Sequence, residues 1–141
     1  MDFGISGKRA LVLASSRGLG LGIATALAKE GANVLLVGRS GEKLDANCKT
    51  INALGKGKAD WVWGDLADDN FVDAMVEAVK DKLGGIDILV NNTGGPTPGL
   101  AQEMTTEKLD TFFQSMVLRV ITLTNALLPQ MKEQGFGRIL T

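Results

Sequence analysis

The sequence predicts an α/β fold in which a doubly wound parallel sheet is covered by helices, formed as a single domain over residues 1–141. Short apolar runs of strand length alternate along the chain with longer segments whose apolar residues recur at helical spacing. The runs are almost continuously apolar, as expected for strands that are buried on both faces. The first run leads into a glycine-rich turn, Gly18-Leu-Gly-Leu-Gly22, that opens a helix.

The predicted strands are the apolar runs that are too short for helices and are bounded by turn residues. In chain order they cover residues 10–13, 34–37, 59–63, 86–90 and 138–140. Because the fifth run lies at the end of the sequence, we expect a sheet that is truncated after its fifth strand.

The first two helices follow the first two strands. Leu19, Ile23 and Leu27 repeat at helical spacing, and Gly31 is expected to end that helix as its C-terminal cap. Ser40 is expected to cap the second helix, because a serine hydroxyl can accept a hydrogen bond from a first-turn amide.

Two further helices are predicted after the third and fourth strands. The third ends at a glycine pair, and the fourth is long and ends at Gly135. Candidate first residues are Asp68 or Asp69 for the third helix and Thr105 or Thr106 for the fourth. The apolar face of the fourth helix is wide, so we expect it to be covered on more than one side.

Composition excludes several kinds of partner and chemistry. The chain has 15 basic and 16 acidic residues with no basic run, so neither nucleic acid nor a membrane surface is an expected partner. A single cysteine, Cys48, and no histidine leave no expected metal site. The N-terminal segment has no apolar signal core, and no run approaches membrane-spanning length, so we expect a cytoplasmic location.

The glycine-rich turn is the main candidate for a binding site. Between a buried strand and a helix, Gly18 and Gly20 let the backbone approach a pyrophosphate, which the amino end of the helix favours. Ser15 and Ser16 offer hydroxyl and amide donors. The alternative is a tight turn whose glycines serve only helix–strand packing. The strand–turn–helix context favours a Rossmann-like dinucleotide site.

The end of the second strand indicates which dinucleotide is bound. NAD-binding domains carry a carboxylate there that holds the ribose 2′-hydroxyl, whereas this chain has Arg39 and Ser40. A guanidinium can pair with a 2′-phosphate, and Arg17 in the glycine turn is a second cation for the same region. Either arginine alone could be a solvated surface charge. Together with the missing acid they favour NADP(H), with NAD(H) as the alternative.

Several short motifs match a known family in order and spacing. Residues Leu13 to Gly20 resemble its T-G-x-x-x-G-x-G turn, and Gly64-Asp65-Leu66 resembles its Asp-Val after the third strand. Asn91-Asn92-Thr93-Gly94 is similar to its N-N-A-G motif. Leu128-Pro129-Gln130-Met131 and Gly137-Arg138-Ile139 resemble its L-P-x-M and G-R-I signatures. The chain therefore resembles the short-chain dehydrogenase/reductase family, and within it the atypical 3-oxoacyl-acyl-carrier-protein reductase-like subgroup with an N-T-G-G-P loop.

The resemblance implies roles for these residues. It implies that Asp65 contacts adenine and that Asn91 stabilises the sheet beside the coenzyme, although Asp65 could be a turn acid and Asn91 purely structural. The loop from Thr93, stiffened by two prolines, shapes the substrate side of the site or is a rigid connector. The candidate coenzyme-binding residues are Ser15, Ser16, Arg17, Gly18, Leu19, Gly20, Arg39, Ser40, Asp65, Leu66, Asn91, Thr93 and Gly94.

The match to the family is imperfect at several positions. Leu13 stands where the family has the threonine of the turn, and Thr93 stands where it has the alanine of N-N-A-G. Ala14 stands where the family has the first glycine of the turn, and an alanine fits there if its φ is negative. Met116 stands where many members have a catalytic asparagine, and we interpret it as a core residue of the apolar stripe.

No catalytic residue is assigned. The resemblance implies a serine, and a tyrosine with a lysine four residues later, all after the fifth strand, where this sequence ends. The sequence contains no tyrosine. We therefore expect this chain alone to be inactive.

The leading hypothesis is the coenzyme-binding part of an NADP(H)-dependent oxidoreductase that reduces a ketone or 3-oxoacyl substrate. A non-catalytic dinucleotide-binding module is the alternative. A domain that binds S-adenosylmethionine is a third hypothesis. Such domains usually have an acidic residue at the end of the second strand, where this chain has Arg39. The resemblance implies oligomer contacts through the long helix, and strand 138–140 leaves an apolar edge, so we expect a homo-oligomer.

Overall fold

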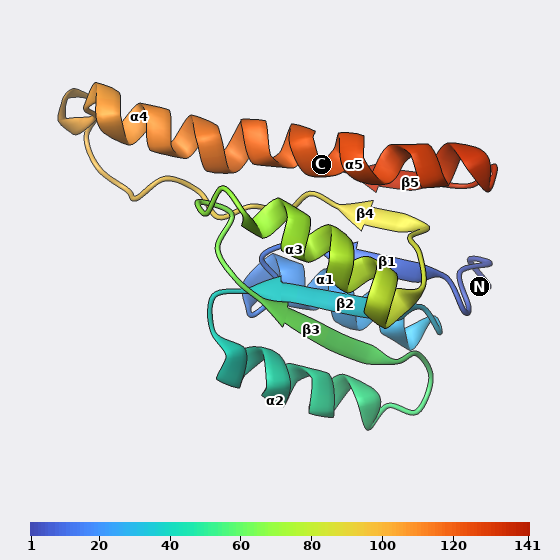
Figure 1. Ribbon diagram of the computed structural model, residues 1–141. Helices are drawn as coiled ribbons and strands as arrows, with labels where there is room; N and C mark the ends of the chain where they lie inside the picture. Colours follow the sequence, from blue (N-terminus) through green and yellow to red (C-terminus); the bar gives the residue numbers. More distant parts are fainter.

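Five parallel strands form one sheet in the order β3-β2-β1-β4-β5, in a computed structural model that describes residues 1–141 (Figure 1). The strands are β1 (Arg9–Val12), β2 (Asn33–Gly38), β3 (Ala59–Trp63), β4 (Ile88–Val90) and β5 (Arg138–Leu140). This confirms the doubly wound sheet predicted from the sequence. The bounds of β3 and β5 are those predicted, whereas β4 begins at Ile88 rather than at residue 86.

The helices lie on both faces of the sheet (Figure 1). They are α1 (Gly18–Lys29), α2 (Gly41–Asn52), α3 (Phe71–Ala78) with a π-helical turn η1 (Val79–Leu83), and a short 3₁₀ turn η2 (Ala101–Glu103). The long last helix runs without a break through α4 (Thr106–Phe113), the π-helical turn η3 (Gln114–Leu118) and α5 (Arg119–Glu133).

Two of the predicted helix starts are confirmed, and one is wrong. The Ser40 and Thr105 hydroxyls accept hydrogen bonds from first-turn amides of α2 and α4. Helix α3 begins at Phe71, after the predicted Asp68 or Asp69. The Asp68 carboxylate accepts a hydrogen bond from the Asn70 amide at 3.0 Å, which closes a turn before the helix can start.

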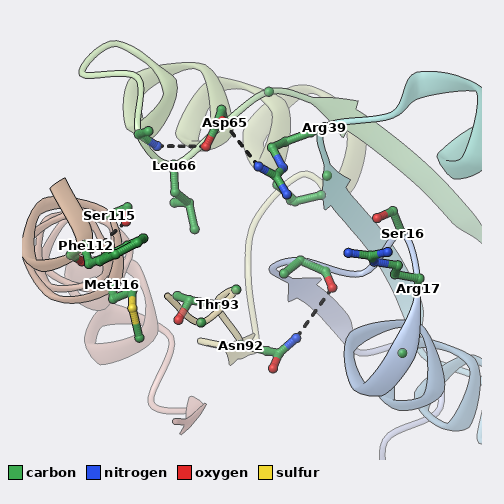
Figure 2. Close-up of a pocket in the computed structure, with 18 of the residues that line it drawn as sticks. Ser16, Arg17, Arg39, Asp65, Leu66, Asn92, Thr93, Phe112, Ser115 and Met116 are labelled. Atoms are coloured by element: carbon green, nitrogen blue, oxygen red, sulfur yellow. Dashed lines mark hydrogen bonds and ion pairs between the residues drawn. The ribbon is translucent and has the colours of Figure 1, made fainter. Parts of the chain in front are cut away.

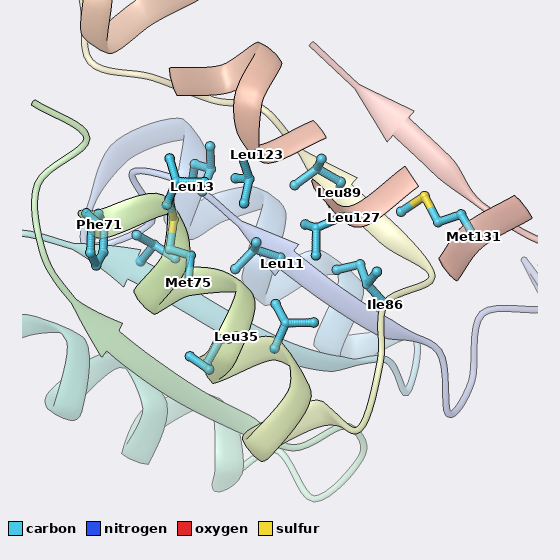
Figure 3. Close-up of a cluster of buried hydrophobic side chains, with 14 residues drawn as sticks. Leu11, Leu13, Leu35, Phe71, Met75, Ile86, Leu89, Leu123, Leu127 and Met131 are labelled. Atoms are coloured by element: carbon cyan, nitrogen blue, oxygen red, sulfur yellow. The ribbon is translucent and has the colours of Figure 1, made fainter. Parts of the chain in front are cut away.

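Successive strand residues point to opposite faces and form two separate cores. Leu11, Leu35 and Leu89 belong to the cluster under α3 and α5 (Figure 3). Their neighbours Val34 and Ile88 belong to the cluster under α1 and α2. Burial on both faces explains why the central strands are continuously apolar.

The long last helix is covered only on its sheet side. Leu123, Leu127 and Met131 are buried, whereas Leu109, Phe113, Val117 and Ile121 are exposed. The expectation that its apolar face would be covered on more than one side is therefore wrong for this chain. By length and composition alone, the helix over residues 106–133 could cross a membrane, which corrects the expectation that no segment approaches that length.

An ion-pair network joins the sheet to the last helix at the amino ends of the strands. The Arg9 side chain donates to the Asp87 carboxylate at 2.9 and 3.1 Å, to the Gly84 carbonyl at 2.9 Å and to the Gln134 side chain at 2.9 Å. Gln134 donates in turn to the Ile86 carbonyl at 2.8 Å. Burial acts to raise the pKa of Asp87, but the hydrogen bonds and charge of Arg9 outweigh it, so that pKa lies below its ordinary value.

Replacing this carboxylate tests how much the network stabilises the fold. We expect Asp87→Ala to lower the free energy of unfolding by about 3 kcal/mol at pH 7, because it leaves a part-buried guanidinium unpaired. Since the pKa of Asp87 is depressed in the folded state, the stabilisation is present above the unfolded value of about 4 and is lost as the pH falls through the folded value. Urea unfolding at pH 7 and pH 3 measures both effects.

The control is Asp45→Ala, which removes the exposed helical pair of Asp45 with Lys49. It should change the stability much less. An equal loss of stability for both variants, or a loss for Asp87→Ala that does not shrink at pH 3, would contradict the prediction.

Candidate functional site

A cavity of about 510 Å³ lies at the carboxyl ends of the strands (Figure 2). Strand β1 lies between β2 and β4, so the chain reverses its direction of winding there, and ligands of open α/β sheets bind in the crevice that this reversal leaves. The loops after β1, β2, β3 and β4 supply most of the wall, and the last helix supplies the rest.

The predicted glycine turn forms one side of the cavity. Ser16, Arg17, Gly18 and Leu19 line it. Gly18 has φ +58°, a conformation that glycine adopts without strain. No side chain caps the amino end of α1, and its first turn holds no acidic residue, so its amides and its positive end are available to an anion.

Gly20 is required by close packing rather than by contact with the cavity. A Cβ atom at this position would lie 2.3 Å from the Ala14 carbonyl oxygen and 2.9 Å from the Asn92 amide nitrogen. Only a glycine therefore lets the first turn of α1 pass this close to the end of β1.

Ala14 does not have the negative φ with which an alanine would fit the turn without strain. Its φ is +47°, and it is the only non-glycine residue of the chain with a positive φ. The turn keeps the shape that a glycine would allow, and the alanine carries the strain of the left-handed region.

Three other predicted site residues lie outside the cavity wall. The buried Ser15 hydroxyl donates to the Val12 carbonyl at 2.7 Å and accepts from the Val37 amide at 2.9 Å, so it joins β1 to β2. The Ser40 hydroxyl caps α2. Asn91 donates through its backbone to the Leu140 carbonyl at 2.8 Å and through its side chain to Thr124 at 3.1 Å, in line with its structural reading.

Two exposed arginines lie at one end of the cavity (Figure 2). Arg17 comes from the glycine turn, and Arg39 directly follows β2. The Arg39 guanidinium pairs with the Asp65 carboxylate at 4.0 Å, and both side chains are largely exposed. Asp65 also accepts a hydrogen bond from the Ala67 amide at 3.0 Å, so it is in part the turn acid that the sequence allowed.

The loop after β4 brings Thr93 and Gly94, two of the candidate residues, to the cavity wall, together with Asn92. The Asn92 side chain donates weakly to the carbonyls of Leu13 and Ala14, at 3.4 and 3.5 Å. The N-N-T-G motif contained this residue, but the sequence alone does not show which of its two asparagines faces the cavity.

The last helix adds a wall that was not predicted from the sequence. Thr111, Phe112, Ser115 and Met116 line the cavity from α4 and η3. Figure 2 shows the last three of these side chains. Met116 is only part-buried, so its interpretation as a core residue is wrong. The four positions share one helix face, and this mixed polar and apolar stripe was the signal that could have found them.

The cavity therefore has a cationic end and a partly apolar end, joined by a glycine turn and a free helix amino terminus. On a parallel sheet with this strand order, these features are typical of the Rossmann-like class of nucleotide-binding domains.

Comparison with known proteins identifies the family within that class. Residues 8–141 match the model of the short chain dehydrogenase family, and the chain belongs to this family. It is 38% identical over 136 residues to the ketoacyl reductase HetN of a Nostoc species, covering 96% of this chain and 47% of that protein. It is 33% identical to the 3-oxoacyl-[acyl-carrier-protein] reductase FabG of Haemophilus influenzae, covering 96% and 54%.

Solved structures agree with this assignment. The L-sorbose reductase of Gluconobacter frateurii, complexed with NADPH and L-sorbose, superposes with a TM-score of 0.92 at 38% identity, covering 99% of this chain and 53% of that one. The 3-oxoacyl (acyl-carrier-protein) reductase of Agrobacterium tumefaciens C58 with NADP bound gives 0.89 at 30% identity, covering 98% and 53%. The chain spans about half the length of the relatives it matches.

The strain at Ala14 is testable. We expect Ala14→Gly to raise the free energy of unfolding by about 1 kcal/mol, because glycine adopts a positive φ without a steric penalty. Ala24→Gly, within α1, should lower the free energy of unfolding, because Ala24 is buried in a helix. Chemical denaturation measures both variants. Destabilisation by Ala14→Gly would show that this backbone conformation carries no strain.

Proposed function

We propose that this chain is the coenzyme-binding part of an NADP(H)-dependent short-chain oxidoreductase that reduces a ketone or 3-oxoacyl substrate. The observation that carries the proposal is the pair Arg17 and Arg39 at one end of the cavity, with no acidic residue at the end of β2. Relatives with NADPH or NADP bound, among them a sugar reductase and a 3-oxoacyl reductase, support it.

The residues of the cavity fit a dinucleotide. The open backbone at Gly18, which lines the cavity, and the free amides of α1 suit a pyrophosphate. The two guanidinium groups suit a ribose 2′-phosphate. Asp65 and Leu66 would hold the adenine, and Thr93 and Gly94 would border the nicotinamide. When bound, the coenzyme supplies or accepts the hydride.

The last helix would form the substrate side of the site. Phe112 and Met116 give that end an apolar wall that excludes water, and Thr111 and Ser115 add hydroxyl groups. A small carbonyl or acyl compound suits such a surface. No residue of this chain is assigned to proton transfer, and we expect the chain alone to be inactive.

A non-catalytic dinucleotide-binding module is the second candidate. It is favoured by Met116, which lines the cavity at the position where the sequence comparison places a catalytic asparagine in many family members. NADPH oxidation with a 3-oxoacyl thioester, measured on the whole protein that carries this chain, separates the two candidates. Turnover supports the oxidoreductase, and tight NADPH binding without turnover supports the module.

The coenzyme preference is tested by Arg39→Ala. We expect the Kd for NADPH to rise about 10- to 100-fold and that for NADH to change little, since charge-assisted hydrogen bonds to the 2′-phosphate are lost. Lys29→Ala, on the last turn of α1, removes a charge away from the cavity and should leave both values unchanged. Calorimetric titration of each coenzyme measures them. Tighter binding of NADH than NADPH by the unmodified chain would favour the NAD(H) alternative.

We propose in addition that the protein is a cytoplasmic homo-oligomer. Val117 and Ile121 on the last helix and Ile139 and Leu140 on the edge strand β5 are exposed apolar residues that self-association would cover.

Sedimentation velocity tests the association. The sedimentation coefficient of the chain should correspond to a mass above that of the 14.9 kDa monomer. Ile121→Lys should shift it toward the monomer value, because burying an unpaired charge in an apolar contact is unfavourable. A monomer at all concentrations would contradict this part of the proposal.

A further inference from the structure

Trp63 is a large aromatic residue that core packing does not explain. It is the last residue of the edge strand β3, its side chain is 63% exposed, and it belongs to neither buried cluster. Its ring nitrogen Nε1 donates a hydrogen bond to the Arg39 carbonyl oxygen at 2.9 Å. The indole of one strand therefore holds the backbone at the end of the neighbouring strand.

This hydrogen bond lies at the corner from which the Arg39 side chain projects. Trp63 pairs in register with Gly38, the residue before Arg39. A Cβ atom at Gly41, two residues after Arg39, would lie 3.3 Å from the Trp61 ring and 3.9 Å from the Trp63 ring. Both tryptophan rings thus pack against the corner between β2 and α2, but only Trp63 donates a hydrogen bond to Arg39.

The Arg39 side chain itself is weakly restrained. It is 76% exposed, and its ion pair with Asp65 has an N–O distance of 4.0 Å. It lines the candidate coenzyme cavity and also a second hollow, of about 370 Å³, whose wall includes Trp63, Asp65 and Asp68. Asp65 lines both spaces, whereas Asp68 lines only the second hollow, so the charge of Asp68 attracts a guanidinium away from the first cavity.

We propose that Trp63 is a positioning residue that directs Arg39 toward the coenzyme and so increases the preference for NADP(H) over NAD(H); this rests on the function proposed above. A guanidinium recognises a phosphate through two parallel hydrogen bonds, so its direction matters as well as its charge. Fixing the Arg39 carbonyl fixes the plane of the following peptide, and with it the direction in which the Arg39 side chain leaves the backbone.

The test compares Trp63→Phe with Trp61→Phe. Trp63→Phe keeps an aromatic ring and removes the N–H donor, and Trp61 is the matched control because it lies on the same strand and lines neither hollow. By calorimetric titration we expect Trp63→Phe to raise the Kd for NADPH about three- to tenfold, the effect of one neutral hydrogen bond. The Kd for NADH should not change, and Trp61→Phe should change neither.

A double-mutant cycle separates positioning from a general loss of structure. In an Arg39→Ala background, Trp63→Phe should have no further effect on NADPH binding, because the residue through which it acts is absent. An equal effect in both backgrounds, an equal weakening of NADPH and NADH, or no effect at all would overturn the inference. The Arg39→Ala result alone tests the proposed function: if it changes neither coenzyme, that function fails and this inference fails with it.

A second measurement does not depend on the folding of Trp63→Phe. In Trp61→Phe, Trp63 is the only tryptophan of the chain. The oxidised coenzymes avoid energy transfer to a reduced nicotinamide, so NADP⁺ and NAD⁺ can be compared at saturation. Engagement of Arg39 by the 2′-phosphate should change the Trp63 emission with NADP⁺ more than with NAD⁺. Equal changes would overturn the inference.

Discussion

The pairing of Arg9 with Asp87 is the interaction on which the arrangement of the central strands depends. It joins the start of β1 to the residue before β4, and through Gln134 it reaches the end of the last helix. These strands are far apart in sequence, and parallel pairing alone leaves their ends free to fray. Because all the strands are parallel, their carboxyl ends meet at the opposite edge of the sheet, where the cavity forms.

The cavity combines a rigid half with a more open one. The half near β1 is held by close backbone packing, in which Gly20 passes the Ala14 carbonyl and the Ser15 hydroxyl joins two strands. The half near the last helix depends on part-buried side chains such as Met116.

Local chemistry explains which features could be predicted from the sequence. Strand β3 and the caps Ser40 and Thr105 depend on short-range hydrogen bonds and apolar runs, and these predictions were right. The start of α3 was wrong, because the turn at Asp68 competes with the helix for the same amides. The position of Met116 in the cavity wall and the hydrogen bond from Trp63 to Arg39 depend on how separate elements pack. A local sequence pattern does not encode that packing.

The π-helical turn η3 has a consequence for how such a protein can diverge. A π turn is a regular helix with one residue inserted, and each residue of an α-helix turns the chain by about 100°. Loss of one residue within 114–118 would rotate α4 relative to α5 and take Thr111 and Phe112 out of the cavity wall. A single codon deletion could therefore exchange the side chains that line this wall of the cavity in one evolutionary step, while the glycine turn and both arginines remain unchanged.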